Sequence, residues 1–254
     1  MKTFCFALQK GGTGKTSTAV SVAVELAKEG YKTLLIDADP QGNATTWILN
    51  KPIQYDFADL LQDNCTVEQC TVKTDIENLF IIPTAGLDGN LKDVAESAAI
   101  QGKPYKIRKL KPTFEKHFNF VIFDLSPSFG TLEKCCLIAS DKIITVLECT
   151  EFAKDGLEIF THRLQETKSD LELSQNDAPL LTNIVLNAKD DRKVLQKAIF
   201  ESFKPLQDYY VINSIPLEPA FEKSQTMHVC LQDFADVKKE TKQAIKDITQ
   251  SLIA

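Results

Sequence analysis

The residues with the clearest chemistry form a glycine-rich loop near the N-terminus, Lys10-Gly11-Gly12-Thr13-Gly14-Lys15-Thr16-Ser17. Glycines let successive backbone N–H groups point at an anion, and a helix that begins behind them adds the partial positive charge of its N-terminus. Lys15 adds a full charge, which at about 4 Å and an effective dielectric constant near 20 attracts a phosphate charge by roughly 4 kcal/mol. The Thr16 hydroxyl can bind Mg²⁺, and the Ser17 hydroxyl can reach a phosphate oxygen. The loop therefore predicts a site for a phosphate-bearing ligand.

This loop departs in one place from the general phosphate-loop pattern, Gly-x-x-x-x-Gly-Lys-[Ser/Thr]. Gln9 stands where the pattern has its first glycine, and a second lysine, Lys10, heads the loop. A short apolar, β-prone segment at residues 3–8 precedes the loop, and an amphipathic helical pattern at residues 14–29 follows it. A glycine-rich hairpin with a chance Gly-Lys-Thr is the alternative, and the strand–loop–helix context disfavours it.

The elements that must position this loop alternate along the chain. Further strands are predicted at 32–36, 79–82, 120–123, 142–147, 181–186 and 209–212, and helices near 86–99, 130–139, 152–171, 190–203 and 236–252. Nearly all-apolar strands that alternate with helices favour a parallel sheet covered on both faces. We therefore predict an α/β, doubly wound, mostly parallel sheet in one domain, residues 1–254, with short helices and turns over 40–116.

Polar residues follow several of these strands. Asp37 and Asp39 follow the second strand, Asp124 follows strand 120–123, and Asn187 follows strand 181–186, while residues 213–216 follow the last strand. In folds of this kind ligands bind at the carboxyl ends of the strands. We expect these polar residues to meet the glycine-rich loop at one edge of the sheet.

Composition narrows the class of protein. The chain has 254 residues, of which 43% are hydrophobic and 25% charged, and its formal net charge is −6. No apolar run approaches the roughly 18 residues of a membrane helix, and the segment before the loop is too short for a secretory signal, so a cytoplasmic protein is expected. The seven cysteines form no Cys-x-x-Cys pair and are expected to be reduced structural residues.

With its second lysine, the loop resembles the deviant Walker A motif of the ParA/MinD ATPases. Three further segments are similar to ParA-type partition ATPases: LLIDADPQGNAT at 34–45 resembles their first switch region, FVIFDLSPSFG at 120–130 the second, and ECTEFAKDGL at 148–157 the segment that follows. The resemblance covers residues 1–165 strongly and the remainder loosely. It implies a P-loop NTPase, Rossmann-like, that binds ATP with Mg²⁺ through Lys10 to Ser17 and hydrolyses ATP.

Roles for individual residues follow from the resemblance. Lys10 is expected to reach the phosphates of the partner in an ATP-dependent homodimer, Lys15 to bind the phosphates of its own subunit, and Asp39 to orient the attacking water. Asp124 is expected to hold Mg²⁺ through water. The residues expected to hold the metal are Thr16, Asp39 and Asp124, and the residues expected near adenine are Asn187 and Pro216. Ordinary structural alternatives are a turn cap for Asp39, a helix cap for Asp124, a strand-end cap for Asn187 and a turn proline for Pro216.

The resemblance also implies partners. ParA-type proteins act with a ParB-type DNA-binding protein and bind DNA without sequence preference, which here points to Arg192, Lys193 and Lys197 and a nucleoid-associated protein. A second basic stretch holds Lys103, Lys106, Arg108, Lys109, Lys111 and Lys116. The sequence departs from the family after Pro216, where Glu218 and Glu222 stand in place of the usual arginines, so solvated charged helices without a DNA role are the alternative.

Three other functions compete with partition. A membrane-positioning ATPase of MinD type needs a basic amphipathic C-terminal helix, and Val237, Thr241, Ala244, Ile248 and Leu252 do form an apolar stripe, but no membrane partner is expected. A metal-cluster ATPase like the nitrogenase iron protein would need a second cysteine to accompany Cys135 or Cys136. An orphan carrier of other cargo, or a transferase that uses the phosphate loop, would keep the fold and change the task.

Overall fold

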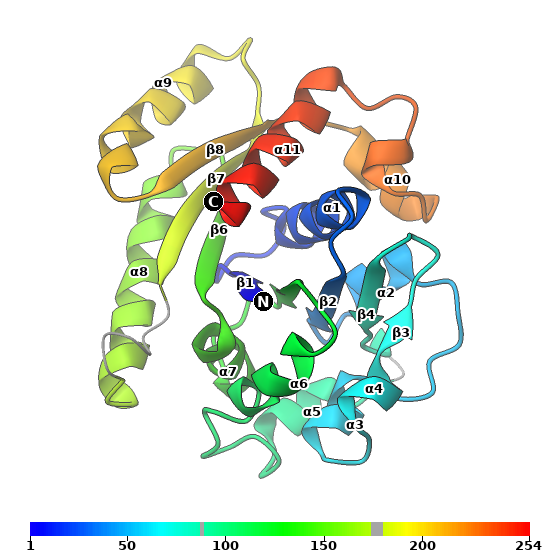
Figure 1. The fold of residues 1–254 in the computed structure, drawn as a ribbon. Coiled ribbons are helices and arrows are strands. Elements are labelled where there is room, and N and C mark those ends of the chain that lie inside the picture. Colours follow the sequence, from blue (N-terminus) through cyan, green and yellow to red (C-terminus); the bar gives the residue numbers. More distant parts are fainter. Residues whose placement is uncertain (87–88, 174–179) are drawn as a thin grey trace.

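A computed structural model describes residues 1–86, 89–173 and 180–254 (Figure 1). Within these residues, the strands form one sheet in the order β3-β4-β2-β5-β1-β6-β7-β8. All neighbouring pairs are parallel except β3 with β4. The strands are β1 (Lys2–Phe6), β2 (Thr33–Ala38), β3 (Val72–Lys73), β4 (Leu79–Ile82), β5 (Phe120–Leu125), β6 (Lys142–Glu148), β7 (Leu181–Lys189) and β8 (Val211–Pro216). The predicted doubly wound, mostly parallel sheet is confirmed.

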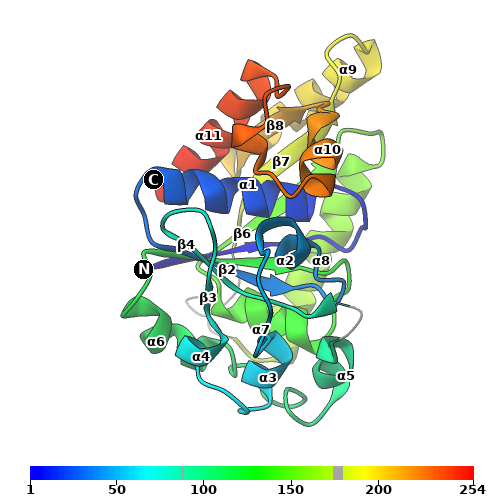
Figure 2. The same ribbon diagram turned by 90° about the vertical axis from the view of Figure 1, so that its right-hand side faces the viewer.

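Two apolar layers cover this sheet (Figures 1 and 2). One layer is built from α1 (Lys15–Lys28), α2 (Asn43–Ile48), α10 (Ala220–Thr226) and α11 (Lys239–Ile253). The other is built from α3 (Phe57–Leu61), α4 (Val67–Cys70), α5 (Leu91–Glu96), α6 (Lys111–Glu115), α7 (Thr131–Ala139), α8 (Ala153–Asp170) and α9 (Val194–Phe203). Short 3₁₀ helices occupy Arg108–Leu110, Lys204–Asp208 and Leu231–Asp233. Because both faces are covered, the central strands β2 and β5 are buried at every position.

Strand ends differ from the predicted ones in a way that affects the site. β2 runs on to Ala38 and β7 to Lys189, so Asp37 and Asn187 lie inside strands, since each remains paired with its neighbour. β8 begins at Val211 and runs to Pro216, so the expectation that residues 213–216 follow the last strand is wrong. The predicted strand ends were based on runs of apolar residues. Because the last residues of these strands are polar, that pattern could not show that the backbone pairing continues through them.

The predicted short helices of the 40–116 region are present, and the helix predicted near 86–99 is observed as α5. Residues 87 and 88 of that prediction lie outside the described residues. The antiparallel β3 and the helix α10 were not predicted, since two residues of strand and seven of helix are too short to show a periodic pattern.

The C-terminal helix α11 packs on its own sheet. Thr241, Ile245, Ile248 and Leu252 are buried against α1 and β8, which lie beside α11 in both views. Glu218 caps the start of the helix, because one of its carboxylate oxygens accepts hydrogen bonds from the backbone N–H of residue 238 (3.0 Å) and the Thr241 hydroxyl (2.9 Å). The apolar stripe of α11 is therefore buried in the protein core. Glu218, an acid at a position where the resemblance led us to expect a base, stabilises the start of α11.

Candidate functional site

The glycine-rich loop connects β1 to α1 at the carboxyl end of the strands. Gly12 and Gly14 have φ of 73° and 93°, in the left-handed region that favours glycine. A Cβ added at Gly11 or Gly12 would meet no atom within 4 Å, so open space lies in front of this part of the loop. No side chain caps the N-terminus of α1. Uncapped N–H groups that border an open space form an anion site.

Asn187 braces the loop from β7. Its side-chain Nδ2 donates a hydrogen bond to the Thr13 carbonyl oxygen at 2.8 Å. A Cβ on Gly14 would lie 2.2 Å from the same nitrogen, so the glycine is required both by its φ and by the close approach of Asn187. The structure thus places Asn187 against the loop itself, in a bracing role that the sequence did not predict.

The two lysines of the loop have different surroundings. Lys15 is buried, and its Nζ donates to the carbonyl oxygen of Lys10 at 2.8 Å. Burial lowers the pKa of Lys15, and the nearby carboxylates of Asp124 and Asp39 oppose that shift. Lys10 is half-exposed and its Nζ lies 3.5 Å from Oε2 of Glu148, the last residue of β6. Exposed pairs of this kind are typically worth about 0.2–1 kcal/mol, so Lys10 can leave Glu148 at little cost.

Two buried carboxylates lie side by side behind the loop, because Asp37 on β2 is paired in register with Asp124 on β5. Asp37 accepts hydrogen bonds from the Thr45 N–H (2.8 Å), the Thr45 hydroxyl (2.7 Å) and the Asp39 N–H (3.3 Å). Burial raises the pKa of Asp37 to about 6 despite these bonds. Asp37 therefore ties the end of β2 to the start of α2, a role that its position after a strand did not reveal.

Asp124 has no such partners. It is fully buried, and neither carboxylate oxygen has a hydrogen-bond partner among the described residues. Burial and the neighbouring Asp37 raise the pKa of Asp124 well above its ordinary value, and the positive charge of nearby Lys15 opposes the shift only in part. A buried carboxylate without partners is costly, and such a group calls for a functional explanation. The helix-cap interpretation of Asp124 is wrong, since Asp124 lies inside β5.

Asp39 lies at the turn that follows β2 and is mostly buried. Its Oδ1 accepts a hydrogen bond from the N–H of Gln41 at 2.9 Å, across Pro40. The turn-cap alternative is therefore realised in the structure, and it holds the carboxylate close enough to Lys15 to influence the lysine's pKa.

The second switch-like segment, residues 120–130, is anchored by Glu133, a residue for which the sequence predicted no role. Oε1 of buried Glu133 accepts hydrogen bonds from the hydroxyls of Ser126 and Ser128, both at 2.5 Å, and its Oε2 accepts one from the Gly130 N–H at 2.9 Å. Glu133 stands at the third position of α7, so one carboxylate caps that helix and also gathers the loop that follows Asp124. The spacing Gly-x-x-Glu was a possible signal of this cap.

The donor set fits a hard divalent cation. Asp124 offers two unpartnered carboxylate oxygens, and the Thr16 hydroxyl lies at the start of α1 near it. Mg²⁺ prefers carboxylate, hydroxyl and water oxygens and is bound through few protein ligands together with substrate phosphates. The cation would relieve the desolvation of Asp124 and screen its repulsion with Asp37.

Two other predicted groups lie beyond the loop. Pro216 ends β8 and is paired with Lys189, two residues past Asn187 along β7.

Arg192 makes a two-pronged ion pair with Asp190, from Nε and Nη2 at 2.8 Å each, which lowers the pKa of Asp190. The remaining members of the predicted DNA set, Lys193 and Lys197, are exposed at the start of α9.

The two cysteines considered as ligands of a metal cluster, Cys135 and Cys136, are buried and do not lie at the surface. Cys135 and Cys136 are both fully buried in α7, and burial raises the pKa of Cys135 to about 12. Among the described residues, no group of three or more His, Cys, Asp or Glu could hold a metal ion. No helix in the described ranges is long and apolar enough to cross a membrane.

Comparisons with known proteins agree with this geometry. A family model described as an AAA domain matches residues 1–177. The chromosome-partitioning ATPase Soj of Treponema pallidum is 29% identical over 215 residues, which cover 84% of this chain and 82% of the relative. The sporulation initiation inhibitor Soj of Bacillus subtilis is 29% identical over 199 residues, 77% of this chain and 76% of the relative.

Solved structures share the fold. A variant of Cyanothece McdA in complex with ATP superposes with a TM-score of 0.84 at 20% identity and covers 99% of this chain and 96% of that one. At such identity the likeness concerns the fold alone. The matched family model spans more than two thirds of the sequence and includes the glycine-rich loop, both carboxylates behind it and the segment after β6. The chain therefore belongs to this AAA domain family and is a ParA-type ATPase.

Proposed function

We propose that the chain is an Mg²⁺-dependent ATPase of one domain that forms a homodimer with ATP, binds DNA without sequence preference and is stimulated by a ParB-type partner in the cytoplasm. The observation that carries the proposal is Asp124, a fully buried carboxylate with both oxygens unpartnered, directly behind a phosphate loop. Its two free oxygens support the proposal that the site binds a divalent cation. The proposed role in partition is supported by the similarity to chromosome-partitioning relatives.

Nucleotide binding rests on the loop. The backbone of Gly11 to Gly14 borders open space, and Lys15 stands buried behind it with its ammonium on a backbone carbonyl. A phosphate group that enters this space exchanges that carbonyl for a full negative charge, which is a stronger partner for Lys15. The Thr16 and Ser17 side chains and the N-terminus of α1 complete the phosphate site.

Asp124 and Thr16 would hold Mg²⁺ beside the phosphate site. Thr16 would bind the cation directly and Asp124 through water, while Asp39 is the third acidic oxygen source at this edge. The cation supplies charge neutralisation for the transferring phosphoryl group. The chain itself keeps Asp124 in place through β5 and keeps water from its back face by burying it completely.

Hydrolysis is assigned to Asp39 and Lys10. Asp39 is held by the turn that it caps at Gln41, which gives its free oxygen a defined direction for a water molecule. Lys10 is proposed to leave Glu148 and contact the phosphates of the partner subunit, where a positive charge stabilises charge that develops in the transition state. The weak exposed pair with Glu148 is the kind of contact that such a movement can break.

DNA binding is proposed for the exposed bases at the start of α9. Lys193 and Lys197 are free to meet phosphates, and binding through several such contacts falls steeply with salt. Arg192 is already held by Asp190, so its positive charge is largely compensated. Glu218 does not replace a base at the surface, because it is buried and caps α11.

The membrane alternative loses its main support in the structure. A MinD-type anchor needs an amphipathic helix with a free apolar face, whereas the apolar face of α11 is buried on α1 and β8. The partition proposal needs no such helix.

The decisive experiment is size-exclusion chromatography with light scattering, with Mg²⁺ and a non-hydrolysable ATP analogue or ADP. We expect a dimer only with the ATP analogue. Lys15→Ala is expected to remain monomeric and to bind no nucleotide in calorimetry. Lys10→Ala is expected to bind ATP and remain monomeric, and a normal dimer of Lys10→Ala contradicts the role given to Lys10.

DNA binding has its own test, which is a mobility shift on duplex DNA at low salt with ATP or ADP. We expect retention with ATP alone, weakened in the double variant Lys193→Glu/Lys197→Glu. A matched control is Lys242→Glu on α11, outside the proposed surface. Equal, negligible retention with ADP and ATP would remove the DNA part of the proposal and leave the ATPase part intact.

A further inference from the structure

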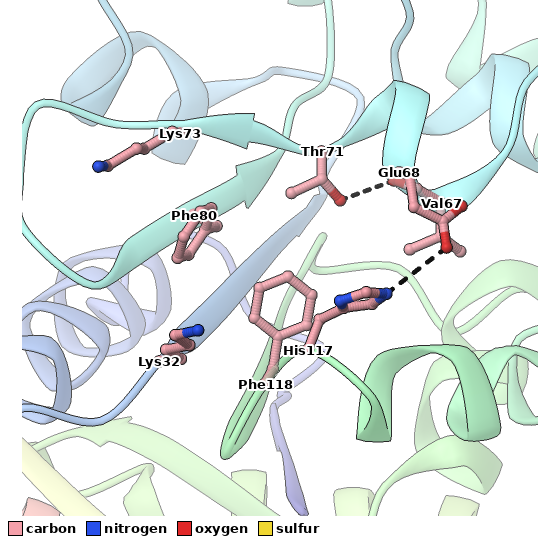
Figure 3. A pocket seen from close by; sticks show the side chains of 8 residues that line it. All are labelled: Lys32, Val67, Glu68, Thr71, Lys73, Phe80, His117 and Phe118. Carbon is pink, nitrogen blue, oxygen red and sulfur yellow. Dashed lines mark hydrogen bonds and ion pairs between the residues drawn. The ribbon is translucent and has the colours of Figure 1, made fainter.

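Two adjoining cavities lie at the edge of the sheet opposite the phosphate loop. Lys32 precedes β2 and Phe118 precedes β5, so these residues mark the amino ends of strands whose other ends carry Asp37 and Asp124. The first cavity, about 310 Å³, is shown in Figure 3, and the second has a volume of about 560 Å³. Both are lined by Val67 and Glu68 of α4, so they share a rim.

The first cavity has an aromatic interior and charged ends. The rings of Phe80 and Phe118 meet edge to face, with centroids 5.4 Å apart. Lys32 and Lys73 lie at one end of the cavity, and His117 lies at the other, where its Nε2 is 3.7 Å from Oε1 of Glu68 (Figure 3). Its volume is at the small end of the about 300–1,000 Å³ found for ligand sites, which suits a single apolar side chain or ring.

The second cavity is basic. Four lysines line it, Lys103, Lys106, Lys109 and Lys116, against two acids, Asp63 and Glu68. Lys106 is paired with Asp63 at 2.7 Å. The other three lysines, like Lys32 and Lys73 of the first cavity, form no ion pair with any residue that the structure describes, and all five are exposed.

The charge of this surface is opposite to that of the chain. Six lysines and two acids line the two cavities, whereas the whole chain carries a formal net charge of −6. Grouped like charges repel each other, and they attract and steer a partner of opposite sign. None of these residues belongs to the phosphate loop or to the carboxylates behind it, so the nucleotide site does not account for them.

We propose that the two cavities dock an acidic peptide segment of a partner protein, with one apolar side chain in the first cavity against the rings of Phe80 and Phe118 and carboxylates over the lysines of the second cavity. Peptide recognition combines a pocket that takes an anchor side chain with a charged rim that sets register. The aromatic recess supplies the first, and Lys103, Lys109 and Lys116 supply the second.

A nucleic acid fits this surface less well. Glu68 stands on the shared rim, so a phosphate backbone that runs from one cavity to the other would pass a carboxylate, and like charges repel. A peptide can present a backbone N–H or a neutral side chain at that point. The observations therefore favour the peptide, and binding of duplex DNA by the same lysines is the outcome that opposes it.

The test is fluorescence anisotropy at low salt with a fluorescein-labelled peptide of glutamates that flank a single phenylalanine. We expect saturable binding by the full chain, with or without nucleotide. Lys109→Glu/Lys116→Glu is expected to raise Kd by about tenfold or more, because two attractive charge contacts with the peptide become repulsive. The matched charge reversal Lys239→Glu/Lys246→Glu, at two exposed lysines of α11 outside both cavities, is expected to leave Kd within about twofold.

The anchor is tested from the peptide side, which leaves the fold untouched. Replacement of its phenylalanine by serine is expected to weaken binding about tenfold, and equal binding of both peptides would overturn the role of the aromatic cavity. No saturable binding of the phenylalanine peptide overturns the proposal. Loss of duplex DNA binding in Lys109→Glu/Lys116→Glu, with the peptide unbound, assigns the surface to nucleic acid instead. Because nucleotide is not required, a negative result here is distinguishable from failure of the ATPase proposal.

Discussion

Asp124→Asn should make the protein more stable while it damages the metal site. Asp124 is fully buried, lacks hydrogen-bond partners for both oxygens and is paired in register with Asp37. Each buried and unsatisfied polar group costs about 1–3 kcal/mol, and more when it is charged. Asparagine keeps the shape and removes the charge. We therefore expect the free energy of unfolding to rise by about 1–3 kcal/mol at pH 7.5.

The sign depends on pH in a defined way. Burial and Asp37 raise the pKa of Asp124, so the folded state holds its proton to higher pH than the unfolded state does. Folded protein thus binds more protons, and stability falls as pH rises above the ordinary pKa of an aspartate. The advantage of Asp124→Asn should therefore be large at pH 7.5 and small at pH 4, which is close to the ordinary pKa of 3.8, so that the unfolded state has only begun to lose the proton that the folded state keeps.

Thermal unfolding followed by circular dichroism at the two pH values measures this difference. For a chain of this size about 2–4 °C corresponds to each kcal/mol, so Tm should rise by roughly 2–12 °C at pH 7.5. Addition of Mg·ADP at about 100 times its Kd should stabilise the natural protein by about 2.7 kcal/mol and the variant by much less. A less stable variant, or an equal response to Mg·ADP, would refute the reasoning.

The matched control is Asp141→Asn, a carboxylate whose surroundings are the reverse. The carboxylate of Asp141 accepts hydrogen bonds from Lys111 Nζ (2.7 Å) and from the N–H and hydroxyl of Thr3 (both 2.8 Å). Burial by itself raises the pKa of Asp141, but these partners outweigh burial and lower it overall. This variant should lose stability at pH 7.5, opposite in sign to Asp124→Asn.

Three shorter predictions test other parts of the site. Gly14→Ala should lower stability by more than about 1 kcal/mol and weaken nucleotide binding in calorimetry, because Gly14 has a φ of 93° and an added Cβ would lie 2.2 Å from Asn187. Adding Asn187→Ala to this variant should restore only part of the lost stability, since the φ strain remains. Glu218→Ala should cost about 1–2 kcal/mol in urea unfolding by loss of the α11 cap, and Glu222→Ala, an exposed acid, should be neutral within about 0.5 kcal/mol. The pKa of Asp37, raised from 3.8 to about 6, should make stability fall by about 3 kcal/mol as pH rises from about 4 to 6, and Asp37→Asn should remove that slope in urea titrations at each pH.

Much of the phosphate site was predictable because it is local. Gly11 to Ser17 are contiguous, and the strand before them and the helix after them are recorded in the same stretch of sequence. The same holds for the alternation of strands and helices, which set the fold class. Asp124 was predicted as a metal residue from resemblance, but its isolation from any hydrogen-bond partner is a property of the packed interior alone.

The missed roles all involve residues far apart in the chain or at the ends of elements. Asn187 reaches Thr13 across 174 positions, and Lys10 meets Glu148 only because β6 lies beside β1. Glu218 looked like a surface charge in place of a base, and only the packing of α11 makes it a cap. No periodicity in one segment can show such pairings.

From its residues alone this chain specifies a phosphate loop, a parallel sheet and a set of acids that follow its strands, because backbone propensity and apolar periodicity act over a few neighbouring residues. The packed structure decides which acid is satisfied and which is left bare, which lysine is buried and which is free, and that lysines from distant segments gather beside an aromatic recess. Burial and pairing arise only when separate elements meet, so these properties, and the pKa shifts that follow from them, belong to the fold and not to any single stretch of sequence.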